Sequence, residues 1–183
     1  MTDADGALID DVQPVIPRAF TVGIASGMRS WPPLAALALN YDSAPAQAAW
    51  RRWPVFRSPL GRTLLIAMGA TEFVTDKLPG TQPRIALTVQ PSRIDSGLVG
   101  RLAFAGIAGA AIGSEHGGRN SIVAGAALAV AGAILTNYAG YFARTAGVEA
   151  TGVPNMAVSL AEDAATVALL AAAVPVETMA DRG

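Results

Sequence analysis

Apolar residues gather in five stretches along the chain, at residues 19–41, 60–78, 97–114, 120–143 and 153–176. An α-helix needs about 20 mostly apolar residues to cross the hydrocarbon core of a bilayer, and each stretch approaches or reaches that length. The pattern predicts an all-α fold, a polytopic helical membrane bundle with about five hydrophobic segments. We expect one transmembrane domain over residues 18–176, between a flexible acidic tail at 1–17 and a short tail at 177–183.

The fourth stretch is the clearest candidate for a membrane span. Residues 120–143 contain no Asp, Glu, Lys, Arg or His, and Tyr138 and Tyr141 near one end suit an interfacial aromatic belt. Each of the other four stretches contains charged residues. Charge within a membrane segment is costly and usually faces the bundle interior or a water-filled cavity. These charged residues are therefore the candidates for a site.

The first stretch contains the sequence GMRSWPP at residues 27–33. Pro32 and Pro33 lack backbone donors and obstruct a continuous helix. In lipid, the polar groups that a break sets free must be satisfied by protein or by water in a cavity. We predict a helix broken near residues 27–33, with Arg29 beside the break in a polar interior. The alternative is that Arg29 extends to the headgroups and that the helix restarts after Pro33.

Acidic residues occur in two other stretches. Glu72 and Asp76 are four residues apart, so they share one helical face, and Glu162 and Asp163 lie within the apolar sequence VSLAEDAATVALL. Such buried carboxylates need partners, and the available counter-charges are Arg29, Arg93 and Arg101. The alternative is that Asp76 marks the exit from the membrane and that Glu162 and Asp163 lie in the interface.

Arg93 belongs to the sequence QPSRID between the second and third stretches. The proline before it favours a turn, which could bind an anion through Arg93; a plain polar loop is the alternative. The predicted polar centre is accordingly composed of Arg29, Glu72, Asp76, Arg93, Glu162 and Asp163.

Composition supports a lipid environment. The 183 residues are 52% hydrophobic and only 15% charged, whereas a soluble domain carries roughly 25% charged residues. The net charge of -1 gives no reason to expect a nucleic-acid partner, and cysteine is absent. No nucleotide-binding, nucleophile-elbow or zinc-protease motif occurs, so we expect no cofactor, no metal and no recognisable catalytic pair. The alternative is a soluble, alanine-rich helical domain.

Residues 44–59 alternate arginines with Trp50, Trp53 and Phe56, which is typical of a segment at headgroup depth. Lys/Arg counts should set the orientation of a multi-pass protein. With five crossings they tie at six against six. One side would hold Arg51, Arg52, Arg57, Arg62, Arg119 and Arg182, and the other Arg18, Lys77, Arg84, Arg93, Arg101 and Arg144.

Small residues recur at helical spacing in the third stretch. Gly106, Gly109 and Gly113 form small-xxx-small pairs, which allow close helix packing within a chain or between chains. We expect a lipid bilayer as the main partner and a homo-oligomer through these glycine faces as a further one.

The order of these motifs resembles that of an uncharacterised bacterial family. The resemblance is carried by GMRSWPP at 27–33, EFVTDKLP at 72–79, PSR at 91–93, an arginine-led glycine-rich helix at 101–113 and AED at 161–163, and it covers residues 20 to 172. The family consists of small multi-pass membrane proteins classed as a domain of unknown function. The resemblance implies a bacterial plasma membrane location and no particular reaction.

The function expected from these residues is transport of a small solute or ion through the polar centre. A structural or assembly role, in which the charges only join helices, is the first alternative. A membrane-embedded enzyme that acts on lipid headgroups is the second, although no nucleophile and base are evident in the sequence.

Overall fold

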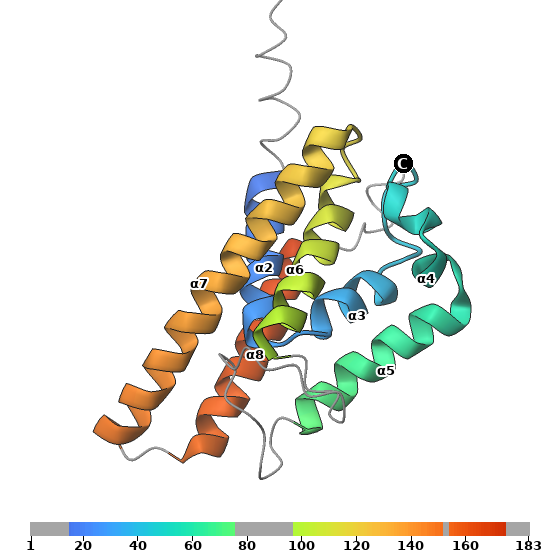
Figure 1. Ribbon diagram of the computed structural model, residues 1–183. Coiled ribbons are helices and arrows are strands. Elements are labelled where there is room, and N and C mark those ends of the chain that lie inside the picture. The colour runs from blue at the N-terminus through green and yellow to red at the C-terminus, as the bar shows by residue number, and fades with distance from the viewer. Residues whose placement is uncertain (1–14, 76–96, 152–153, 175–183) are drawn as a thin grey trace, which may run out of the picture.

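The computed structural model describes residues 15–75, 97–151 and 154–174, and these residues form α-helices and one short 3-10 helix without strands. The α-helices are α2 (Val15–Met28), α3 (Pro32–Leu39), α4 (Pro54–Arg57), α5 (Pro59–Thr75), α6 (Gly97–Gly113), α7 (Arg119–Thr151) and α8 (Asn155–Ala173), and η1 is Ala49–Arg52. The predicted all-α class is confirmed. Helix α2 packs against α6, α7 and α8, and α3 and α5 lie together on one flank of this bundle (Figure 1).

The first apolar stretch is broken at the predicted place. Helix α2 ends at Met28 and α3 begins at Pro32, with Arg29, Ser30 and Trp31 between them. Two prolines suit the start of α3 because the first turn of a helix has no intrahelical use for its N–H groups. The two prolines therefore account for the break, as the sequence predicted.

The same stretch does not run from one end of the bundle to the other. Arg18, near the start of α2, donates from Nη1 to Glu115 Oε2 at 2.6 Å, and Trp50 in η1 donates from Nε1 to Glu115 Oε1 at 3.2 Å. The start of α2, through Arg18, and η1, through Trp50, thus bind the same carboxylate in the turn between α6 and α7. The chain from α2 through α3 to η1 therefore turns back toward its own end, with the break at the tip, and we call this segment the hairpin.

Membrane-length helices are fewer than the five predicted segments. Among the described residues, only Arg119–Ala143 and Met156–Ala173 are long and apolar enough to cross a membrane, judged by length and composition. The break shortens α2 to 14 residues, and α5 and α6 have 17 each. The number of crossings predicted from the sequence is therefore not supported beyond these two helices.

Glycines bring the helices into close contact. A Cβ on Gly27 would lie 2.7 Å from the carbonyl oxygen of Ala133, so α2 approaches α7 at backbone distance. On α6, Gly109 packs against Gly125 and Gly113 against Ser121, again on α7 of the same chain. The small-xxx-small pairs thus serve packing within the chain, and the homo-oligomer stays a prediction.

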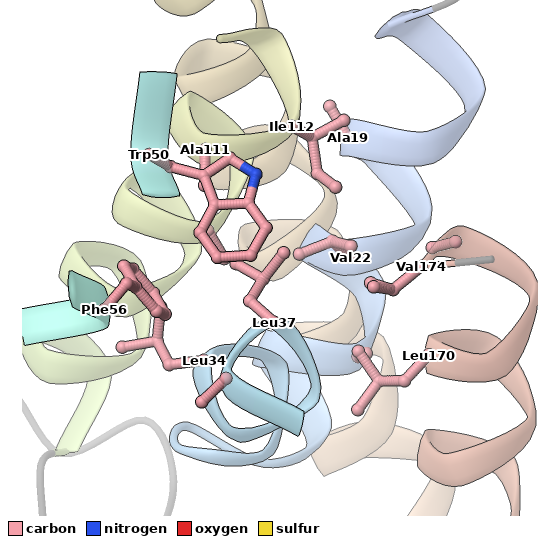
Figure 2. Packing of buried hydrophobic residues seen from close by; sticks show 14 of the residues in the cluster. Ala19, Val22, Leu34, Leu37, Trp50, Phe56, Ala111, Ile112, Leu170 and Val174 are labelled. Atoms are coloured by element: carbon pink, nitrogen blue, oxygen red, sulfur yellow. The ribbon is translucent and has the colours of Figure 1, made fainter. Parts of the chain in front are cut away.

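The largest apolar side chains fill the space between the hairpin, η1 and α6. Trp50 and Phe56 are fully buried and stack edge to face, with ring centroids 4.9 Å apart. Leu37 of α3 lies beneath them, and Leu170 and Val174 close the side next to α8 (Figure 2). This core holds the returning arm of the hairpin, α3, against α6.

Candidate functional site at the break between α2 and α3

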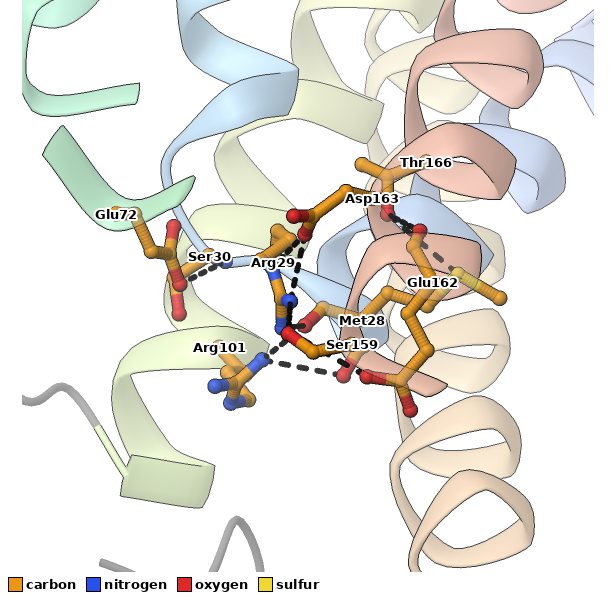
Figure 3. Close-up of polar contacts among 10 residues, drawn as sticks. Met28, Arg29, Ser30, Glu72, Arg101, Ser159, Glu162, Asp163 and Thr166 are labelled. Atoms are coloured by element: carbon orange, nitrogen blue, oxygen red, sulfur yellow. Dashed lines mark hydrogen bonds and ion pairs between the residues drawn. The ribbon is translucent and has the colours of Figure 1, made fainter. Parts of the chain in front are cut away.

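Arg29 lies at the tip of the hairpin and is fully buried. Its Nε and Nη2 donate to Asp163 Oδ1 of α8 at 2.9 and 2.6 Å, and Nη2 also donates to Ser159 Oγ at 3.2 Å. Glu162 Oε2 is 3.9 Å from Nη1 (Figure 3). The prediction that Arg29 faces a polar interior, and not the headgroups, is thus the one the contacts support.

The carbonyl groups at the end of α2 are bound by two guanidinium groups. Arg101 of α6 donates from Nη1 to the carbonyls of Gly27 and Met28 at 3.2 and 2.9 Å, and Arg29 Nη1 donates to Met28 at 3.1 Å. The last carbonyls of a helix have no intrahelical partner and carry a partial negative charge. The two cations therefore satisfy the groups that the break leaves free.

The amide groups on the other side of the break are bound by a carboxylate. Glu72 of α5 accepts from Ser30 N at 2.8 Å through Oε1 and from Trp31 N at 2.7 Å through Oε2. Pro32 and Pro33 have no N–H, so these two amides are the donors directly before α3. An anion at a helix N-terminus is also favoured by the helix dipole. Cations thus bind the carbonyls at the end of α2, and an anion binds the amides at the start of α3.

Apolar groups surround these charges. The rings of Trp31 and Phe104 lie 4.3 Å apart between centroids, beside the residues of the break. On α8, Thr166 donates to the carbonyl of Glu162 at 2.8 Å and lies 3.5 Å from the sulfur of Met28. In this enclosed setting, charge-assisted hydrogen bonds are stronger than in water, and losing a partner is more costly. We call the whole group the break centre: Arg29, Glu72, Arg101, Ser159, Glu162 and Asp163.

Four of the six predicted site residues meet here. Arg29, Glu72, Glu162 and Asp163 come from the hairpin, α5 and α8, while Asp76 and Arg93 lie outside the described residues. Arg101 was considered only as a counter-charge for the acids, whereas it donates to backbone carbonyls. Ser159 was missed, although it precedes Asp163 by four residues, the spacing that places two side chains on one helical face.

A second polar cluster, which sequence reasoning missed, lies at the end of the bundle away from the tip. Arg18 donates from Nε to the carbonyl of Ala173 at 2.9 Å as well as to Glu115, and Trp50 N donates to Ser114 Oγ at 3.1 Å. The Glu115 side chain is only 4% exposed. We call this group the end cluster: Arg18, Trp50, Ser114, Glu115 and the Ala173 carbonyl. Glu115 lies in the short polar sequence EHGGRN, where no neighbouring residue indicates a partner as distant as Arg18.

The described residues contain no obvious set of metal ligands. Residues 15–75, 97–151 and 154–174 contain no group of three or more His, Cys, Asp or Glu side chains placed to hold an ion. The arrangement at the break offers hydrogen bonds and ion pairs.

In the described residues the chain is an all-α protein with a charged break between two of its helices. Residues 16–180 match the family model described as a domain of unknown function, DUF4126, so the chain belongs to this family. Of the resemblance drawn from the sequence over residues 20–172, the match confirms that the family is a domain of unknown function. No curated protein and no solved structure matches the chain.

Proposed function

We propose that this chain is an integral membrane protein that binds a small solute or ion at the break centre and passes it across the bilayer. The observation that carries the proposal is the charged, buried break itself. Two half-helix ends lie beside each other there, each with its backbone groups engaged by an ionised side chain. Discontinuous helices of this kind form the substrate and ion sites of many secondary transporters.

Exposed apolar surface supports the membrane location. In the two membrane-length helices, only 28% of the apolar window in the first and 22% in the second is buried against the rest of the chain. A core helix of a soluble protein would be mostly buried. Large side chains such as Val123, Leu135 and Val167 are more than half exposed. In a bilayer these apolar side chains would contact apolar lipid tails. A bacterial plasma membrane remains the expected location.

The break centre can exchange partners without unfolding a helix. Its backbone carbonyls and amides are held by side chains from α5, α6 and α8, not by a continuous helical ladder. A solute that enters could take one partner's place at a time, since each contact is a separate ion pair or hydrogen bond. The contact of Arg29 with Glu162, at 3.9 Å, is longer than its contact with Asp163, at 2.6 Å, while both carboxylate side chains are 15% exposed. We therefore assign Glu162 the role of the group that a solute reaches first.

The test is flux into proteoliposomes that contain the purified chain. Proton entry is followed with a trapped pH dye, K⁺ and Cl⁻ movement with a membrane potential, and glycerol or urea entry by osmotic swelling. We expect the wild type to exceed protein-free vesicles with at least one probe. Glu162→Gln should return that flux to background without a change in melting temperature, and the exposed Asp42→Asn variant serves as the matched control. Flux equal to protein-free vesicles for every probe would refute transport.

A structural role is favoured by a different observation. Every ionised group of the break centre contacts the chain itself: Arg29 binds Asp163, Glu72 binds two amides, and Arg101 binds two carbonyls. Such pairing would serve equally to lock the hairpin in place. Under this function Glu162→Gln lowers stability and no probe shows flux, which separates the two functions in one set of samples.

A further inference from the structure

The end cluster gathers distant segments at one end of the bundle. Through Arg18 and Glu115, the start of α2, η1, the α6–α7 turn and the last residue of α8 lie together. Helix α4 and the start of α5 follow η1 directly in the chain. Residues far apart in sequence thus form one surface at this end.

The arginines near this end fall into two kinds. Arg51 and Arg62 place their guanidinium carbons 5.0 and 4.2 Å from the centroid of the Tyr41 ring, and they donate to the carbonyls of Ala44 and Phe56 at 3.2 and 2.8 Å. These two arginines are used within the chain. Arg52 and Arg57 are exposed, and the guanidinium group of neither makes an ion pair or hydrogen bond within the described ranges.

No acidic residue offsets these charges locally. Residues 43–71 contain four arginines and no Asp or Glu. Apolar side chains stand next to the two exposed arginines: Val55 is 40% exposed, Leu60 68% and Leu64 56%. Exposed apolar groups mixed with unpaired arginines are unfavourable to solubility in water and fit the boundary between headgroups and acyl chains.

We propose that η1, α4 and the first turns of α5 form a binding surface for anionic phospholipids of the cytoplasmic leaflet. Arg52 and Arg57 bind the lipid phosphates, since the planar guanidinium donates two parallel hydrogen bonds to phosphate oxygens. Val55, Leu60 and Leu64 extend into the acyl region. The proposal rests on the membrane location proposed above and is independent of transport.

The orientation follows from the same geometry. The sequence alone gave a tie of six against six, but Arg18 lies at the η1 end and Arg101 is buried in the break centre. Six arginines of the described residues then belong to the η1 end, namely Arg18, Arg51, Arg52, Arg57, Arg62 and Arg119, and Arg182 of the same sequence set lies outside the described residues. The other set is left with four residues: Lys77, Arg84 and Arg93, which lie outside the described residues, and Arg144. Positive charge accumulates on the cytoplasmic side, so the η1 end faces the cytoplasm.

The first experiment measures which lipids stay with the protein. The chain is incorporated into nanodiscs of equal parts phosphatidylcholine and phosphatidylglycerol, and lipids retained after detergent extraction are quantified by native mass spectrometry. We expect phosphatidylglycerol to be enriched on the wild type and to fall to the bulk ratio on R52Q/R57Q. R52K/R57K keeps the charge and should keep most of the enrichment. Equal enrichment on R52Q/R57Q and the wild type, with both folded by melting temperature, overturns the proposal.

The second experiment determines the side of the membrane. The chain has no cysteine, so single cysteines at the exposed positions Ala46 and His116 can be tested with a membrane-impermeant maleimide. In intact bacterial cells both should be protected, and both should react after permeabilisation. Reaction of both in intact cells overturns the cytoplasmic assignment, and reaction of only one overturns the shared end. Absence of flux with lipid enrichment present would refute transport alone, whereas flux without enrichment would refute this proposal alone.

Discussion

The break centre and the end cluster both join an arginine to a carboxylate, yet they do different work. Arg29 is fully buried, and it and its neighbours replace backbone hydrogen bonds that a continuous helix would make for itself. Arg18 has a side chain 24% exposed, and it joins the ends of regular helices. The same pair of chemical groups thus substitutes for secondary structure in one place and fastens tertiary structure in the other. The difference should appear directly in the energetics.

Substitution of Arg29 should have the largest effect. Arg29→Met leaves the Asp163 carboxylate, whose side chain is 15% exposed, without its cation, and breaking a mostly buried pair in this way costs up to about 3–5 kcal/mol of unfolding free energy. Adding Asp163→Leu to Arg29→Met should recover part of the loss, because no unpaired charge then remains. Thermal unfolding of the purified variants measures both. If the double variant is less stable than Arg29→Met, the carboxylate has a further partner that matters more.

Neutralising Glu72 should come next. Glu72→Gln keeps the size of the side chain but presents one acceptor and one donor group to two backbone amides. A lost hydrogen bond to a charged group costs about 1.5–3 kcal/mol, so we expect that loss in unfolding free energy. Asp42→Asn, an exposed carboxylate in the same half of the chain, should change stability by less than about 0.5 kcal/mol. Equal effects of the two substitutions would mean that Glu72 does not stabilise the break.

The same replacement at the end cluster should cost less than at the break. Arg18→Met removes a side chain that is 24% exposed and leaves Glu115 with the Trp50 indole as a donor, so we expect a loss of about 1–2 kcal/mol. Comparing Arg18→Met with Arg29→Met in one unfolding series tests the contrast between the clusters. Equal losses would show that burial of the arginine does not decide its contribution.

Glu162→Gln should have the smallest effect on stability. The ion pair with Arg29 is 3.9 Å long, compared with 2.6 Å for Asp163, and a loosely held pair at this distance contributes about 0–1 kcal/mol. Melting temperature therefore separates this variant from Glu72→Gln, although both remove one charge from the same centre. A large loss of stability would mean that Glu162 holds the break together and is not the residue that a solute reaches first.

The sequence predicted the parts of this molecule that depend on neighbouring residues. The break follows from Pro32 and Pro33, and the helical stretches follow from runs of apolar residues. The inward position of Arg29 was predicted because a charge in an apolar segment needs a polar partner. Asp163 is that partner. These arguments need only local chemistry and the nature of the surrounding solvent.

What the sequence did not predict depends on which faces meet. Apolar periodicity shows that a helix has a face to bury, but it does not show that α3 turns back or that Arg101 reaches the carbonyls of α2. Glu115 stood in a short turn with no local sign that Arg18, 97 residues earlier, would bind it. Counting residues 19–41 as a crossing followed from the length of the apolar run, and length cannot distinguish a span from a hairpin.

The long separation between Arg29 and Asp163 has a consequence for biosynthesis. The two residues are 134 positions apart, so at about 5–20 residues per second roughly 7–27 s pass before the ribosome completes the carboxylate that neutralises the arginine. During that interval the hairpin tip carries an unpaired charge and stays near water or the translocation machinery. In the membrane location proposed above, the α2–α3 hairpin is synthesised before α8 and therefore reaches its final depth only after α8 has followed.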